Sequence, residues 1–287
     1  MRYAIYTTNF GLLGDARLLA EMAAEAEAAG WDGLFLWDHL EWPDSEPAVD
    51  PWVALAACAM TTSRIRLGTM VTPLARRDIV KLARETVSVD RLSNGRLTLG
   101  VGLGWQTIPE WGSFGHQTDA KTRGEMLDEG LDVLAALWSG DPVDHQGAHY
   151  SVKTDGMAPP VQAPRIPVWI GGTWPSRKPF RRAARWDGMM PIAKTVMEGT
   201  DLTPDDIAEI ASYSKEHRGA EAEPMEIAKG GMTAGADDTE EPSAFEAAGA
   251  TWWLESIVPW GNTREGVLAR IRQGPPAGGK GNRPPVD

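Results

Sequence analysis

Apolar residues recur along the chain with two alternating periods. Short apolar runs such as 33–37, Gly-Leu-Phe-Leu-Trp, are typical of buried strands. They alternate with segments such as 15–30, in which apolar residues recur at helical spacing. Asp15 is suited to cap the start of that helix and Gly30 to end it.

This alternation predicts eight strand–helix pairs. Eight such units favour an α/β fold made of a single (β/α)8 TIM barrel, with an open doubly wound sheet as the alternative. We expect one domain over residues 1–273, an irregular insertion at 139–165 that forms a modest substrate lid, and a disordered Gly/Pro-rich tail at 274–287. The predicted strands are 3–8, 33–37, 65–71, 96–104, 167–172, 187–192, 225–231 and 251–258, and the helices are 15–30, 50–62, 78–92, 120–138, 176–186, 203–218, 243–249 and 263–273.

Composition narrows the choice of partners. The 287 residues carry a formal net charge of −12, which disfavours nucleic acid and anionic membrane surfaces. The single cysteine, Cys58, lies in an apolar run and excludes an internal disulfide. The N-terminal segment lacks the apolar core of a signal peptide, and no apolar run is long enough to span a bilayer. We therefore expect a cytoplasmic protein. The thirteen tryptophans could pack the core or line a ligand pocket.

The chemistry of such a barrel lies at the carboxyl ends of its strands. Asp38 and His39 directly follow the second predicted strand. His39 can donate or accept a proton near neutral pH, and Asp38 either orients the imidazole or caps a backbone amide. Other residues that follow predicted strands are Thr7, Thr8, Asn9, Met70, Val71, Thr72, Gly104, Trp105, Gln106, Gly171, Gly172, Lys194, Gly230, Gly231 and Glu255.

Several other barrel chemistries can be weighed against these residues. The spacing of His145 and His149 is a weak metal motif, because both lie in a Gly/Pro-rich loop. Lys194 keeps an imine-forming aldolase open. The stretch 170–188 joins Gly171-Gly172 to a run of basic residues, which is either a phosphate site or a solvated basic helix face.

At this point the chain resembles the bacterial luciferase-like flavin-dependent oxidoreductases. The resemblance rests on Asp38-His39, on the motifs RIRLGTMVTP, DRLSNGRLTLGVGLGW and PVWIGG, and on the segments 125–152 and 181–188. It implies a (β/α)8 barrel that binds FMN or the deazaflavin coenzyme F420 across the strand ends. It also implies a bulge after the third strand, with a non-proline cis peptide bond at Met70–Val71, below the tricyclic ring.

The resemblance also implies site residues. His39 and Asp38 are the expected catalytic residues, and no metal is expected. Trp42, Asn9 and Lys194 are expected in the substrate pocket, and Trp37, Trp42, Trp105 and Met70 as apolar walls. The expected cofactor-binding residues are Met70, Val71, Thr72, Gly104, Trp105, Gln106, Gly171, Gly172 and Thr173.

We therefore predict a flavin-type oxidoreductase, either a luciferase-like monooxygenase or a hydride-transferring reductase, acting on a small organic substrate. Deazaflavin-dependent relatives often carry a glutamate after Gly104-Trp105, and the nearest acid here is Glu110. The alternatives are a Lys194-dependent aldolase and a non-catalytic flavin carrier. A separate flavin reductase and a homodimer are the expected partners.

Overall fold

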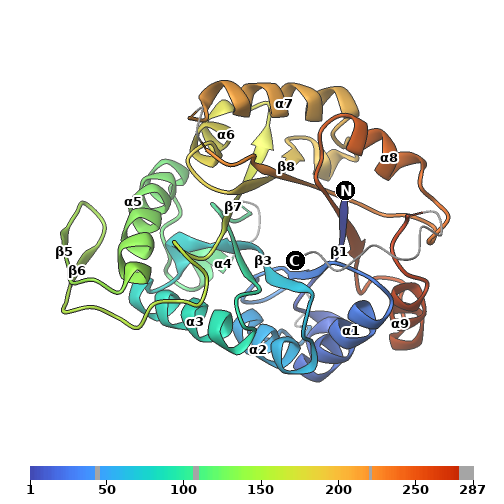
Figure 1. Cartoon of the computed structure of the whole chain (residues 1–287), viewed down its shortest axis with the longest axis horizontal. Coiled ribbons are helices and arrows are strands. Elements are labelled where there is room, and N and C mark those ends of the chain that lie inside the picture. The colour runs from blue at the N-terminus through green and yellow to red at the C-terminus, as the bar shows by residue number, and fades with distance from the viewer. Residues whose placement is uncertain (43–45, 106–109, 220–221, 278–287) are drawn as a thin grey trace.

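The computed structural model of the chain describes residues 1–42, 46–105, 110–219 and 222–277 (Figure 1). Within these ranges, eight parallel strands close into a barrel in the order β1-β2-β3-β4-β7-β8-β9-β10, with β10 pairing β1. This confirms the predicted (β/α)8 barrel and excludes the open sheet. The barrel strands are β1 (Arg2–Thr7), β2 (Gly33–Leu36), β3 (Arg66–Pro73), β4 (Leu97–Gly102), β7 (Val168–Trp174), β8 (Gly188–Ala193), β9 (Glu226–Gly231) and β10 (Trp252–Ile257).

Helices surround the barrel (Figure 1), and α1 begins at the capping residue that its sequence offers. The Asp15 side chain accepts a hydrogen bond from the Arg17 amide, and Gly30 follows the same helix with φ +88°, as predicted. The helices are α1 (Ala16–Ala28), α2 (Pro51–Thr61), α3 (Ile79–Leu92), α4 (Glu110–Ser113), α5 (Ala120–Ser139), α6 (Arg177–Ala183), α7 (Pro204–His217), α8 (Glu240–Ala247) and α9 (Arg264–Arg272), with 3-10 turns η1 (Gly11–Leu13), η2 (Leu74–Arg76) and η3 (Val196–Glu198).

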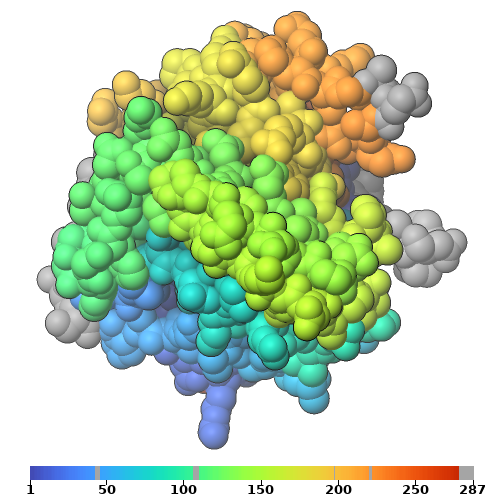
Figure 2. Space-filling model, turned by 90° about the vertical axis from the view of Figure 1, so that its left-hand side faces the viewer, coloured from blue at the N-terminus to red at the C-terminus, as the bar shows by residue number. Residues whose placement is uncertain are grey.

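The insertion at 139–165 differs from its prediction. It contains an antiparallel hairpin of β5 (Val143–Gln146) and β6 (Ser151–Thr154), which lies across the outer face of the barrel (Figure 2). After the hairpin, the Gln162 side chain donates hydrogen bonds to Asp90 Oδ1 and to the carbonyl of Leu97, both at 2.7 Å. Leu97 is the first residue of β4, so the insertion descends beside the barrel to its amino end. The expectation of a lid over the strand ends is therefore wrong.

Large side chains fill the barrel interior. Phe35, Trp169 and Trp252 are buried there with Met70, and their rings contact one another. At the amino end of the strands, Glu226 accepts hydrogen bonds from both indole N–H groups, at 3.1 Å from Trp169 and 2.9 Å from Trp252. Arg2 and Arg66 also pair with this carboxylate. Several tryptophans are thus part of the core, and the amino end of the barrel is closed.

The structure also bears on the predicted tail, on Cys58 and on membrane-spanning segments. Gly274 is buried and Ala277 packs against the core, so the packed chain continues at least four residues beyond the expected boundary at 273. Residues 278–287 lie outside the described ranges. Cys58 is buried as expected, and burial raises the pKa of its thiol to about 12. Within the described ranges, no helix has the length and apolar character needed to cross a membrane.

Candidate active site

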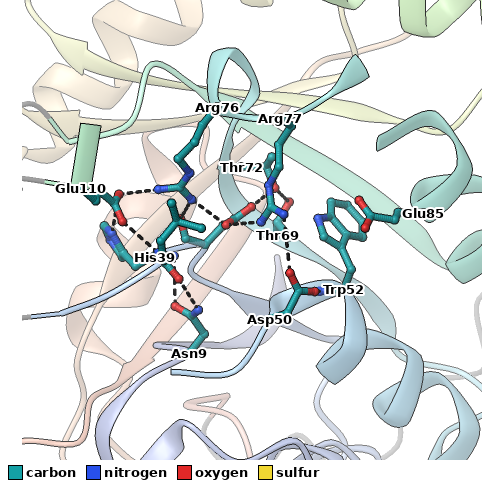
Figure 3. Close-up of polar contacts among 12 residues, drawn as sticks. Asn9, His39, Asp50, Trp52, Thr69, Thr72, Arg76, Arg77, Glu85 and Glu110 are labelled. Atoms are coloured by element: carbon teal, nitrogen blue, oxygen red, sulfur yellow. Dashed lines mark hydrogen bonds and ion pairs between the residues drawn. The ribbon is translucent and has the colours of Figure 1, made fainter. Parts of the chain in front are cut away.

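A histidine–glutamate pair lies at the carboxyl end of the barrel. His39 follows β2, and its Nδ1 lies 3.2 Å from Oε1 of Glu110, the first residue of α4 (Figure 3). The second carboxylate oxygen of Glu110 accepts a hydrogen bond from the Leu40 amide at 2.9 Å. The carboxylate is completely buried, whereas the imidazole is partly exposed. Glu110 therefore sets the orientation of the imidazole through Nδ1, and within the described residues no hydrogen bond is made to Nε2.

A buried arginine joins this pair to a second carboxylate. Arg76 Nη1 lies 2.5 Å from Glu110 Oε1, and Arg76 Nη2 lies 2.7 Å from Asp38 Oδ1 (Figure 3). The side chains of all three residues have no exposed surface. Arg77 and Thr72 also bind the Asp38 carboxylate, at 2.5 and 2.8 Å. Buried charges of both signs thus meet at the strand ends, as burial of charge requires.

The charge of Glu110 follows from these contacts. Burial alone raises the pKa of the Glu110 carboxyl, because water no longer stabilises the anion. The hydrogen bond from His39 and the charge of Arg76 outweigh burial and hold this pKa below its usual value. Glu110 is therefore a carboxylate at neutral pH. Burial and the charge of Arg76 lower the pKa of the nearby His116.

Two predicted site residues have structural roles instead. Asp38 is bound by two arginines and Thr72, so it does not orient His39, and Glu110 does so in its place. Asn9 is fully buried, and its Nδ2 donates to the carbonyls of His39 and Val49, both at 2.8 Å. Its Oδ1 accepts from the His39 amide at 3.2 Å. Asn9 therefore holds the backbone of His39 and does not line a substrate pocket.

The end of β3 carries the predicted irregularity. The Met70–Val71 peptide bond is cis, and the pairing of β3 with β4 shifts register between Thr69 and Thr72. The Met70 side chain is buried in the barrel interior, and the Thr72 hydroxyl bonds to Asp38. Only Val71 of these three leaves side-chain surface partly exposed. Met70 therefore packs the interior and does not form a side wall of the mouth.

Gly171 and Gly172 lie near the middle of β7, and Gly171 lies beside Val71 of β3. A Cβ placed on Gly171 would come 2.8 Å from a methyl group of Val71, so only glycine fits beside this side chain. Thr173 follows them, half-buried. The basic run in 177–185 is paired with neighbouring helices: Arg177 with Glu209, Arg182 with Asp128 and Arg185 with Asp132. These arginines bind helices α5 and α7, so the hypothesis that the basic run forms a phosphate site is wrong for them.

The predicted site residues still to be placed are Gly104, Trp105, Gln106 and Lys194. Gly104 has φ +75° and packs tightly against Trp111, whose indole N–H donates to the carbonyl of Trp105 at 3.2 Å. Gln106 lies outside the described residues. Lys194 is exposed, whereas an imine-forming lysine needs a desolvated site, so the aldolase alternative loses its support.

His145 and His149 do not form a metal site with their neighbours. His145 pairs with Glu129 at 3.0 Å, and Glu129 also accepts hydrogen bonds from the amides of the hairpin turn, including that of His149. Among the described residues no group of three or more His, Cys, Asp or Glu side chains is arranged to hold a metal ion.

Sequence reasoning missed Arg76 and Arg77 and gave Glu110 no defined role. The available signal was a pair of arginines directly after the third strand, next to the strand that Asp38 follows. Two cations at the carboxyl end of an otherwise apolar strand indicate buried carboxylate partners. The position of Glu110 could not be derived in this way, because a loop separates it from β4.

Comparisons with known proteins identify the family of the chain. A family model described as luciferase-like monooxygenase matches residues 3–267. The chain is similar to an uncharacterized protein of Mycobacterium tuberculosis, with 35% identity over 137 residues, which are 48% of this chain and 47% of that protein. The alignment therefore spans about half the length of that relative.

Two further proteins carry descriptive names. The chain is 30% identical to an F420-dependent glucose-6-phosphate dehydrogenase of Amycolatopsis mediterranei over 227 residues, covering 71% of this chain and 67% of that enzyme. Among solved structures it is similar to an F420-dependent secondary alcohol dehydrogenase in complex with an F420-acetone adduct, with a TM-score of 0.77 and coverage of 95% and 97%. The identity to that structure is 16%, so this likeness concerns the fold alone.

Proposed function

Because the chain belongs to the luciferase-like monooxygenase family, we propose that it is an oxidoreductase that uses a flavin-type cofactor, FMN or F420, on a small organic substrate. Of the two cofactors we propose F420, with hydride transfer as the reaction. The carrying observation is the contact between Glu110 and His39 at the carboxyl end of the barrel. The name of the relative from Amycolatopsis mediterranei, an F420-dependent glucose-6-phosphate dehydrogenase, supports the same choice.

The strand ends suit a flat cofactor because small residues leave their backbone open. A Cβ on Gly102 or on Gly171 would come 2.8 Å from Val71, so bare backbone flanks this side chain on two strands. We assign the ring to Val71 and the main chain around it, and the phosphate end to the last residues of β7. The proposed cofactor-binding set is Met70, Val71, Thr72, Gly104, Trp105, Gln106, Gly171, Gly172 and Thr173, of which Gln106 lies outside the described ranges.

Bound F420 supplies hydride acceptance and donation. The chain supplies the proton. His39 directs Nδ1 to Glu110, and within the described ranges its Nε2 has no hydrogen-bond partner. Nε2 can therefore take the hydroxyl proton of an alcohol or return a proton to a carbonyl oxygen. Glu110 orients the ring, and the charge of Arg76 helps to keep Glu110 ionised. We propose His39 as the catalytic residue and Asp38 as a support for Arg76.

Titration of the purified chain with oxidised F420 and, separately, with FMN tests this proposal. A change in the absorbance and fluorescence of F420 that saturates at one equivalent per chain is the expected result. Binding of FMN alone would instead indicate oxygen chemistry, because reduced deazaflavins react poorly with oxygen. Binding of neither cofactor would overturn the proposal. The homodimer, the separate flavin reductase and the cytoplasmic location stay predictions.

A further inference from the structure

The carboxyl end of the barrel has one strongly apolar side. We propose that Phe10, Trp42 and Trp260, here called the aromatic wall, select an uncharged, apolar substrate, such as a hydrocarbon ring or chain that carries the reacting hydroxyl or carbonyl group. This inference rests on the proposed function, since it concerns the molecule that meets His39. The three residues come from the segments after β1, β2 and β10, which are adjacent strands of the barrel.

Ring geometry makes the aromatic wall one continuous surface. Phe10 and Trp42 are stacked, with ring centroids 4.3 Å apart and planes 6° from parallel. Trp260 lies 5.7 Å from Trp42 and 5.9 Å from Phe10. Contacts of this kind stabilise the rings in place by about 0.5–1.5 kcal/mol each beyond area burial. The wall is therefore a fixed surface that does not have to order itself when a ligand arrives.

The aromatic wall extends from the candidate catalytic residue to solvent. The imidazole of His39 lies 5.2 Å from Trp42 and 6.1 Å from Phe10, measured between ring centroids. Phe10 is fully buried, Trp42 is half-buried, and Trp260 is 53% exposed. Trp260 is thus the most exposed ring, it contacts Trp42, and Trp42 contacts His39, so the aromatic wall connects solvent with the candidate catalytic residue.

Such exposure has a physical cost that a ligand would remove. An indole left half in water forgoes about 25 cal/mol for each Å² of apolar surface that could be buried. Trp260 nevertheless lies in a short turn next to Trp42, where its free surface continues the surface that leads to His39. An apolar molecule placed against this surface would bury it.

Charge on the same side argues against an anionic substrate. The segments 8–15, 37–49 and 258–263, which carry the aromatic wall, contain no lysine or arginine. Glu41 and Glu46, both at least partly exposed, add negative charge there, and the whole chain carries −12. Arg76 and Arg77, which follow the neighbouring strand β3, are already paired with Asp38. A phosphorylated sugar would thus meet apolar and acidic surface, without a cation to bind its phosphate.

Calorimetric titration of the full chain, with and without bound F420, tests the inference. The probes are cyclohexanone as an uncharged apolar ligand, glucose 6-phosphate as an anion, and tetramethylammonium as a cation. We expect cyclohexanone to bind at least tenfold more tightly than the other two. Trp260→Ala should weaken cyclohexanone binding by about tenfold, Trp260→Phe should largely restore it, and Met60→Ala, at another exposed apolar side chain, should leave it unchanged.

Several results would overturn the inference. These are tighter binding of glucose 6-phosphate or of tetramethylammonium, an unchanged affinity for cyclohexanone in Trp260→Ala, and equal losses in Trp260→Ala and Met60→Ala. A change in oligomeric state in Trp260→Ala without a loss of cyclohexanone affinity would show that Trp260 covers an interface between chains instead. Failure to bind F420 or FMN would count against the proposed function alone, since the probes also report on the cofactor-free chain.

Discussion

Replacement of Arg76 by methionine tests the central feature of the site. Arg76 is the one cation in contact with both Asp38 and Glu110 among the described residues, and none of the three side chains has exposed surface. Methionine keeps most of the length and removes the charge. Asp38 would retain Arg77 and Thr72, whereas Glu110 would keep only the His39 imidazole and the Leu40 amide. The variant therefore leaves a buried carboxylate without a permanent cation.

The expected cost can be estimated from this burial. Removal of one partner of a buried ion pair typically lowers the free energy of unfolding by about 3–5 kcal/mol. Urea denaturation at neutral pH, followed by circular dichroism, measures it. Arg177→Met is the matched control, because Arg177 pairs with Glu209 on the surface, with exposed fractions of 40% and 57%. Loss of such an exposed pair costs at most about 1 kcal/mol.

The pH dependence of stability gives a second, independent readout. The folded-state pKa of Glu110 is lowered, so its contribution to stability is present above the unfolded value of about 4.3 and is lost as pH falls through the folded value. In Arg76→Met this pKa should rise, because the charge of Arg76 no longer offsets burial, so the loss of stability at this group with falling pH should become smaller. The charged and titratable groups that act on Glu110 among the described residues are His39, Arg76 and His116. Loss of Arg76 also removes one cause that lowers the pKa of His116, so the comparison is read on the acid limb, below the usual imidazole range.

Equal losses of stability in Arg76→Met and Arg177→Met would refute this reasoning. The same holds for an acid limb of stability that keeps its wild-type slope in Arg76→Met. Either result would mean that Glu110 does not depend on Arg76 for its charge.

Three further substitutions test separate parts of the site. His39→Ala should slow turnover by about 10²–10⁴-fold in steady-state assays while leaving the cofactor dissociation constant nearly unchanged, and equal rates would remove His39 from the mechanism. Asn9→Ala should lower the free energy of unfolding by about 1–3 kcal/mol in urea titrations, because two buried carbonyls lose their donor; a loss below that range would contradict the anchoring role. Gly172→Ala places a Cβ 2.3 Å from Cβ of Pro179, so α6 must move, and cofactor affinity measured by titration should fall. Gly219→Ala, with open space around it, is the control, and equal affinities in both variants would argue against a cofactor at β7.

Local patterns along the chain were sufficient to predict most of the barrel. The strand–helix units carry their own periodicity, and several also carry a capping residue such as Asp15, so they can be recognised without their neighbours. The position of His39 at the carboxyl end follows from the end of β2 alone. The cis bond at Met70–Val71 was anticipated from the family resemblance.

The failures concern contacts between segments that are distant in sequence. Asp38 lies beside His39 in the chain, but its partners are two arginines after β3, and the partner of His39 belongs to α4. The hairpin β5–β6 depends on Glu129, a residue of α5 whose carboxylate accepts hydrogen bonds from its turn. Pairings of this kind depend on where loops place side chains in space. The local hydrophobic periodicity contains no information about that placement.

The closed amino end of the barrel also restricts how reactants reach and leave the site. Glu226 and the indoles of Trp169 and Trp252 fill the amino end of the barrel in the part of the chain that the structure describes. Reactants therefore enter and leave at the carboxyl end. When two molecules react there, the one that is bound more deeply has to bind first and be released last. A compound bound at the outer position would block release of the molecule bound at the inner position. Occupancy of the outer position would therefore control exchange at the inner one.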